Sequence, residues 1–211
     1  VNEGQVSEFI GVINYSITPL NRDVEISFTP YLDAGITNED TNWDDAFWET
    51  LSVSENNDQA FIHSQTLKTN FNVCTFMQSK VLLNDTQVDI DGHVEKQENS
   101  ICITYLSKVW KGEKATLQKF AGYVVSTNHK TETLVAAAKK VLEKGITLGY
   151  AGLLDMQKDS WAEIWEMADI VIEGDIKAQQ GIRFNIFQLN QTYLGKDARL
   201  NIGPKGFTGE K

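Results

Sequence analysis

Apolar and polar side chains alternate with a period of two through most of the first 127 residues. The clearest alternation covers residues 9–17, and a shorter one runs from Val24 through Ile26 to Phe28. Period-two alternation is the pattern of a strand with one buried face. It predicts further strands at residues 61–68, 71–83, 101–110 and 115–126, separated by turn signals at residues 84–85, 91–92 and 111–113. Several strands joined by short turns, with no helix between them, predict an antiparallel β-sandwich or part of one.

The spacing of apolar residues becomes helical after residue 128. In residues 130–145, KTETLVAAAKKVLEKG, the apolar side chains share one stripe, with Thr131 expected as the N-cap and Gly145 as the residue that ends the helix. A second helix over residues 150–168 keeps the i, i+3, i+4, i+7 rhythm for five turns. A brief extended crossing is expected at residues 170–172.

A third helix is expected at about residues 176–194, and its composition differs from that of the other two. Ile182, Ile186, Leu189 and Tyr193 form one stripe, and Phe184, Phe187 and Leu194 extend the apolar surface around the axis. The same helix carries six amide side chains, at Gln179, Gln180, Asn185, Gln188, Asn190 and Gln191. A helix that is apolar on most sides packs on most sides, and buried amides need hydrogen-bond partners. Two preceding helices are too few to enclose it, so its remaining neighbours are expected beyond Lys211.

Composition narrows the class of protein. The chain has 211 residues, 41% of them apolar and 23% charged, which is ordinary for a globular protein. Its formal net charge of −10 argues against nucleic acid and anionic membrane surfaces as partners. No apolar run approaches the ~20 residues of a membrane-spanning helix. The first residue is Val rather than Met, which is consistent with a chain that begins inside a longer protein.

The cysteine and histidine positions offer little chemistry. Cys74 and Cys102 each lie in a strand-like run, so buried thiols in a reducing cytoplasm are favoured over a disulfide. His63, His93 and His129 are dispersed without metal-ligand spacing, and no metal site is expected.

The segment DTNWDD at residues 40–45 begins like a calcium loop. Its sixth position is Asp45 rather than Gly, and its twelfth is Leu51 rather than Glu, so an acidic surface loop is favoured. Trp43 and Trp48 flank this loop with Phe47 between them, a set that could stack on a sugar or anchor the loop to an adjoining domain. Anchoring is the favoured interpretation.

The chain ends in a glycine-rich loop, GPKGFTGEK, whose backbone is expected to run close to another group. Lys205 and Glu210 are equally well explained as ligand contacts or as a solvated pair. Glu210 alone is not a catalytic acid, because a general acid needs a partner and a placed substrate.

Residues 160–211 resemble glycoside hydrolase family 65, and the segments YSITPLN at 15–21, YLDAGITNED at 31–40 and FWE at 47–49 are similar to it as well. The resemblance covers nearly the whole chain. It implies an α+β protein: part of an N-terminal β super-sandwich (residues 1–127), a helical linker (128–174) and the first helix of a catalytic α/α barrel (175–211). No catalytic residue is carried over, because the family's sugar-gripping pair, general acid and phosphate site follow the last residue of this chain. The loop beside the active-site mouth is matched by Lys205, Gly206, Phe207, Thr208, Gly209 and Glu210.

Members of this family cleave α-linked glucose disaccharides, mostly by inverting phosphorolysis. The resemblance therefore implies a disaccharide, with maltose preferred over trehalose or kojibiose, and inorganic phosphate as co-substrate without any other cofactor. It also implies a homodimer in the cytoplasm, and inactivity of this chain by itself. A hydrolase of the same family, a non-catalytic carbohydrate-binding module and a pure dimerisation module remain open alternatives.

Overall fold

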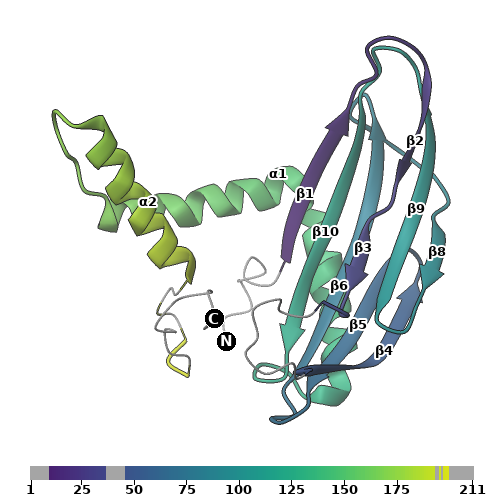
Figure 1. Cartoon of the computed structure of the whole chain (residues 1–211), viewed down its shortest axis with the longest axis horizontal. Helices are drawn as coiled ribbons and strands as arrows, with labels where there is room; N and C mark the ends of the chain where they lie inside the picture. Colours follow the sequence, from purple (N-terminus) through teal and green to yellow (C-terminus); the bar gives the residue numbers. More distant parts are fainter. Residues whose placement is uncertain (1–9, 37–45, 193–194, 196, 200–211) are drawn as a thin grey trace. The chain divides into compact units, whose positions relative to one another are not determined.

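A computed structural model describes residues 10–36, 46–192, 195 and 197–199 of the chain. The strands come first and two helices follow (Figure 1). The strands are β1 (Ile10–Ile17), β2 (Val24–Phe28), β3 (Tyr31–Asp33), β4 (Trp48–Asn56), β5 (Gln59–Thr66), β6 (Asn72–Leu83), β7 (Thr86–Val88), β8 (His93–Lys96), β9 (Ser100–Val109) and β10 (Ala115–Val125). A short 3-10 turn, η2 (Thr131–Thr133), leads into α1 (Leu134–Ala168), and α2 (Ile176–Thr192) follows.

The strands form two antiparallel sheets that face each other. The larger sheet has the order β1-β10-β6-β5-β4, with β7 also paired to β6. The smaller sheet has the order β2-β9-β3, with β8 also paired to β9. These sheets confirm the sandwich that the period-two pattern predicted, and the two helices after it confirm the α+β class.

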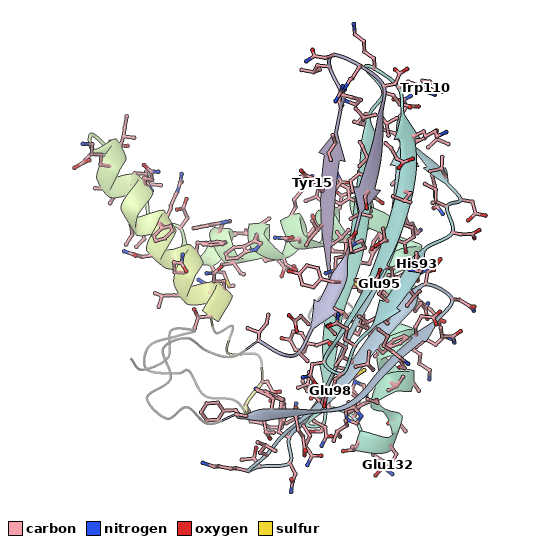
Figure 2. All side chains as sticks on the ribbon, turned by 45° about the vertical axis from the view of Figure 1, so that its right-hand side comes forward. Tyr15, His93, Glu95, Glu98, Trp110 and Glu132 are labelled. Carbon is pink, nitrogen blue, oxygen red and sulfur yellow. The ribbon has the colours of Figure 1, made fainter. Side chains whose placement is uncertain are left out.

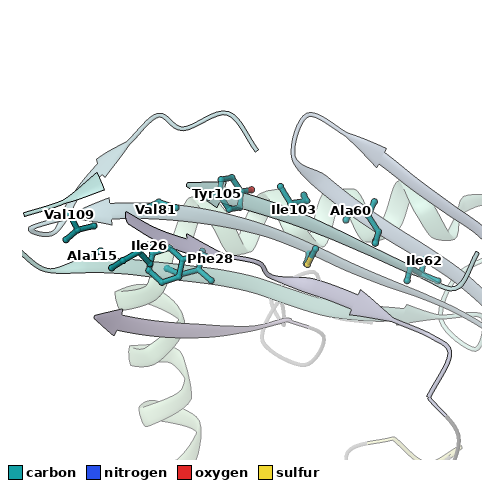
Figure 3. Close-up of a cluster of buried hydrophobic side chains, with 12 residues drawn as sticks. Ile26, Phe28, Ala60, Ile62, Val81, Ile103, Tyr105, Val109 and Ala115 are labelled. Carbon is teal, nitrogen blue, oxygen red and sulfur yellow. The ribbon is translucent and has the colours of Figure 1, made fainter. Parts of the chain in front are cut away.

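The larger sheet is buried on both faces, each against a different layer. On one face it packs against the smaller sheet around Phe28, Ile62 and Tyr105 (Figure 3). On the other face Phe76 and Phe120 pack against the first part of α1. The alternation along β6 and β10 therefore divides side chains between two cores, which is why these strands are rich in apolar residues on both faces.

Four strands were missed by the periodicity. β3, β7 and β8 have three or four residues, too few to show an alternation. β4 is longer, but its register against β5 shifts between Thr50 and Ser52. A shift of this kind inserts an extra residue and breaks the period of two.

The predicted boundaries of the first helix were wrong at both ends. Thr131 lies in the 3-10 turn, and α1 begins at Leu134 after a turn in which the Thr133 hydroxyl donates to the Lys130 carbonyl oxygen (2.9 Å). The helix then runs through Gly145 and breaks at Gly149, which has φ 69° and ψ −179°. That conformation is available almost only to glycine. Gly145 is required instead by close packing, since a Cβ there would lie 2.2 Å from Ile10 Cδ1.

The chain forms two compact units, and the division falls within α1, between Leu154 and Asp155. The first unit contains the sandwich and the first part of α1, and the second contains the rest of α1 and α2. Within the described residues, no helix is long and apolar enough to cross a membrane. The division of the chain into sandwich, linker and barrel at residues 127 and 174 stays a prediction.

Candidate functional site

The loop that the sequence singled out, from Lys205 to Glu210, lies outside the described residues, as do Trp43 and the acidic segment 40–45. The candidate site that the structure describes is the helical hairpin of the second unit. It is built from the C-terminal part of α1, the connection 169–175 and α2.

Aromatic rings form the centre of this hairpin. Phe187 of α2 stacks on Trp161 of α1, with ring centroids 4.9 Å apart and an interplanar angle of 28°. Trp161 also contacts Trp165, with centroids 5.9 Å apart. The i, i+4 spacing of the two tryptophans puts them on one helix face, so the predicted amphipathic stripe of residues 150–168 is the face that receives α2.

An open groove of about 530 Å³ runs beside the aromatic stack. It is lined by Trp165, Ile176, Gln179, Gln180, Arg183, Phe184 and Phe187. The lining contains no carboxyl, imidazole or thiol group, so it offers apolar surface, amides and a guanidinium but no general acid or nucleophile. The groove is therefore equipped for binding and not for bond cleavage.

The connection between the helices is held by one amide side chain. Gln179 Nε2 donates to the Ile170 carbonyl oxygen (2.8 Å), and Gln179 Oε1 accepts from the Ile172 amide (2.6 Å). The side-chain amide thus pairs with residues 170–172 as a neighbouring strand would. The crossing expected at 170–172 is present as a segment without helix or strand assignment, pinned by this residue.

Two further contacts fix the ends of the connection. The Arg183 guanidinium donates to both carboxylate oxygens of Asp169, at 2.9 and 2.6 Å. This hydrogen bonding lowers the pKa of Asp169 and raises that of Arg183. At the start of α2, Asp175 Oδ1 accepts from the Lys177 and Ala178 amides, both at 3.0 Å, as an N-cap does.

The sequence analysis missed these positioning residues. The N-cap could have been found, because Asp175 comes directly before the first residue of α2. The Asp169–Arg183 and Gln179 contacts could not, because they depend on how the chain reverses direction between the helices.

The first unit holds the histidines apart. His63 Nε2 lies 2.9 Å from Asn72 Oδ1, and His93 Nε2 lies 3.7 Å from Glu95 Oε1 on the outer face of the smaller sheet, where Figure 2 labels both residues. Among the described residues no group of three or more His, Cys, Asp or Glu side chains is placed to hold a metal ion. Cys74 and Cys102 are free thiols, the first buried and the second half-buried, so the expectation of full burial holds for Cys74 only.

Tyr105 is the most unusual buried polar residue of the sandwich. Its side chain is 3% exposed and its hydroxyl has no hydrogen-bond partner within the described structure. Burial raises the pKa of Tyr105, and the charge of Asp58 raises it further. Burial also raises the pKa of Asp58, with contributions from Glu55, Asp91 and Asp89. These groups form a buried end of the sandwich core with no arrangement for catalysis.

The fold and the helical hairpin define an antiparallel β-sandwich module that continues into paired helices. Residues 6–164 match the family model of the glycosyl hydrolase family 65 N-terminal domain. The chain therefore belongs to glycosyl hydrolase family 65.

Relatives of known name agree with this assignment. The maltose phosphorylase of Bacillus subtilis (strain 168) is 37% identical over 199 residues, which cover 94% of this chain and 26% of that protein. The alpha,alpha-trehalose phosphorylase of Thermoanaerobacter brockii is 30% identical over 210 residues, covering 96% of this chain and 27% of that protein. The chain thus spans about a quarter of the length of the curated relatives it matches.

A solved structure shows the same fold. A putative kojibiose phosphorylase from the human microbiome superposes with a TM-score of 0.83 at 21% sequence identity, covering 97% of this chain and 26% of that chain. The sandwich and the helices after it are therefore a shared architecture.

Proposed function

We propose that this chain is a non-catalytic part of an inverting disaccharide phosphorylase, a longer polypeptide called here the parent protein. Its similarity over nearly its whole length to phosphorylases about four times as long supports this proposal. In the parent protein, the sandwich and the helical hairpin would form the frame against which the catalytic part packs.

The observation that carries the proposal is the unburied apolar surface of α2. Ile186 is the one residue of this helix that is buried. Ile176, Phe184 and Leu189 are 87%, 59% and 63% exposed. Large apolar side chains gathered on one element mark a surface that another element covers. Further helices of the parent protein are the proposed cover, in agreement with the first barrel helix that the family resemblance implies.

The proposed reaction needs groups that the described residues do not supply. Phosphorolysis with inversion requires a carboxylic acid to protonate the glycosidic oxygen and a phosphate held in line on the opposite face of the sugar. Positioned acid catalysis contributes about 10²–10⁴-fold, and the placement of phosphate contributes much of the rest. The groove lining of the hairpin has no carboxyl group. The acid and the phosphate site are therefore proposed to lie in the catalytic part of the parent protein.

Maltose is the proposed substrate, with β-glucose 1-phosphate and glucose as products. The support is the higher identity to the maltose phosphorylase, 37%, than to the trehalose phosphorylase, 30%. No cofactor besides the co-substrate phosphate is proposed, and the proposed location is the cytoplasm.

The test compares this chain with the parent protein. Each is incubated with maltose, trehalose or kojibiose, with and without phosphate, and glucose and glucose 1-phosphate are measured. We expect the parent protein to form glucose 1-phosphate from maltose only when phosphate is present, and this chain to form neither product. Turnover by this chain alone would overturn the non-catalytic role, and phosphate-independent release of glucose by the parent protein would indicate a hydrolase.

A carbohydrate-binding module is the second candidate, and the groove beside Trp165 and Phe187 is the observation that favours it. Aromatic faces next to amides can hold a sugar ring. Titration calorimetry of this chain with maltose, trehalose and glucose tests it. The absence of heat at millimolar sugar removes this candidate, whereas binding that disappears in Trp165→Ala supports it.

A homodimer is the proposed assembly of the parent protein, from the family resemblance. Light scattering of the parent protein at several concentrations measures its mass directly. A monomer at all concentrations would contradict the proposal.

A further inference from the structure

Strand β1 lies at one end of the larger sheet, and within the described residues it pairs only with β10 (Figure 1). The pairing is regular over all eight residues, from Ile10 opposite Gly122 to Ile17 opposite Ala115. The opposite side of β1 therefore presents a straight row of backbone donors and acceptors.

This edge lacks the features that prevent edge strands from pairing with further strands. Such features are charged side chains, proline, bulges and short length. The sequence of β1, IGVINYSI, contains no charge and no proline, and its register has no bulge.

The other edges do carry these features. β4 has Glu49 and Glu55 and a register shift between Thr50 and Ser52. In the smaller sheet, β3 has three residues, β8 carries Glu95 and Lys96 on four residues, and β2 carries Glu25 on five. The lack of protection is thus specific to β1 among the edges that the structure describes.

The side chains of β1 are apolar on both faces, as in an interior strand. Ile10 and Val12 pack into the core beneath α1, and Ile17 packs into the core between the sheets. On the same face as Ile17, Ile13 and Tyr15 are 61% and 56% exposed. Figure 2 labels Tyr15 on this outer strand of the sheet. A further strand beside β1, with its own side chains alternating, would cover Ile13 and Tyr15.

We propose that β1 is an interior strand in the parent protein, where an uncharged β-strand from outside this chain pairs along its free edge and covers Ile13 and Tyr15. The inference rests on the proposed function in one respect, namely that a longer parent protein exists. The curated relatives are about four times as long as the matched region, which leaves ample chain to supply a strand. A strand tethered to the same polypeptide is held near the edge at a high effective concentration.

A second copy of this chain is a poorer occupant of the edge. Eight residues at ~3.4 Å make a strand about 27 Å long, and with a thickness of about 10 Å the edge offers about 270 Å² per copy. Stable interfaces bury about 800 Å² per partner. Pairing of two copies through β1 alone is therefore too small, whereas a covalently tethered strand needs no such area.

Hydrogen exchange measured by mass spectrometry on the parent protein and on this chain tests the proposal. In this chain, the amides of residues 10–17 that do not face β10 should exchange quickly. In the parent protein, the same amides should exchange at least tenfold more slowly. Residues 48–56 of β4, an edge in both molecules, are the control and should exchange alike in both. Equal exchange of residues 10–17 in the two molecules overturns the proposal.

A variant pair gives a second readout. Ile13→Lys should leave the melting temperature of this chain nearly unchanged, because the side chain is already exposed, and should lower that of the parent protein. Ser52→Lys on β4 should change neither. If Ile13→Lys leaves the parent protein unaffected, or if this chain dimerises with concentration-dependent protection of residues 10–17, the tethered strand is wrong. The readouts need no activity, so a parent protein without phosphorolysis would contradict the proposed function and leave this inference standing.

Discussion

Gly145 of α1 packs against Ile10 of β1 so closely that a Cβ at position 145 would lie 2.2 Å from Ile10 Cδ1. The contact lies in the core between the larger sheet and α1, and it explains why a glycine stands inside a helix at this point. The helix and the strand approach each other only because one of them has no side chain there.

We expect Gly145→Ala to destabilise the protein, because Ile10 must leave its position to admit the methyl group. Overpacking of this kind costs about 1–3 kcal/mol. Gly181→Ala is the matched control, since a Cβ at this position of α2 meets nothing within 4 Å. It should stabilise by up to about 1 kcal/mol through helix propensity. Urea unfolding of the two variants checks the prediction, and a neutral or stabilising Gly145→Ala would contradict it.

The two thiols should differ in reactivity. Cys74 has no exposed surface, and burial raises its pKa to about 12, so at neutral pH it is a protonated and inaccessible thiol. Cys102 is half-buried in β9. A thiol reagent added to the native protein at pH 8 should label Cys102 first and Cys74 only at the rate of unfolding. Peptide mapping of the labelled protein shows the order, with Cys102→Ser as the control; rapid labelling of Cys74 in that variant would disagree with the structure.

The Asp169–Arg183 pair predicts a direction for the dependence of stability on pH. Hydrogen bonds from Arg183 lower the pKa of Asp169 in the folded protein below its ordinary value of 3.8. A lowered pKa contributes stability that is present above the unfolded-state pKa and is lost as the pH falls through the folded-state value. Carbon-detected NMR titration of the Asp169 carboxyl group measures the shift.

The control for this pair is Arg183→Gln. It should return the pKa of Asp169 toward its ordinary value and remove the part of the acid sensitivity that this pair causes. An Asp169 pKa that is the same in both proteins would show that the two side chains do not interact in solution.

Gln179→Ala should loosen the connection between the helices without disrupting α2. The substitution removes two hydrogen bonds to residues 170–172, each contributing about 0.5–1.5 kcal/mol, while alanine favours the helix. Hydrogen exchange at the Ile172 amide should accelerate by about tenfold. Gln180→Ala, at the next position on the same helix, should leave Ile172 unchanged, and equal acceleration by both variants would assign the effect to the helix instead.

Much of the sandwich could be predicted because its main strands bury one face or both. Strands β1, β2, β5, β6, β9 and β10 were expected within one to three residues of their observed bounds. The edge strand β4 was not, because its bulge breaks the alternation and its side chains are largely exposed. Edge strands are stabilised by their neighbours, which a local pattern does not contain.

The helices were predicted in number but not in their breaks. Glycine at position 145 has the local signature of a helix end, and Gly149 has the same identity. Tertiary packing decided between them: Gly145 is needed where Ile10 approaches, and Gly149 where φ is positive. The site loop at Lys205–Glu210 remains a prediction from the family resemblance.

The sequence by itself determined the class of fold, the family and the unusual character of α2, because periodicity and composition record which faces of each element are apolar. The tertiary structure decided which glycine bends α1, which side chains pin the helical hairpin, and which edge of the sandwich stands unprotected. These features arise from contacts between residues distant in the chain, such as Ile10 with Gly145 and Asp169 with Arg183, and a local pattern cannot contain them.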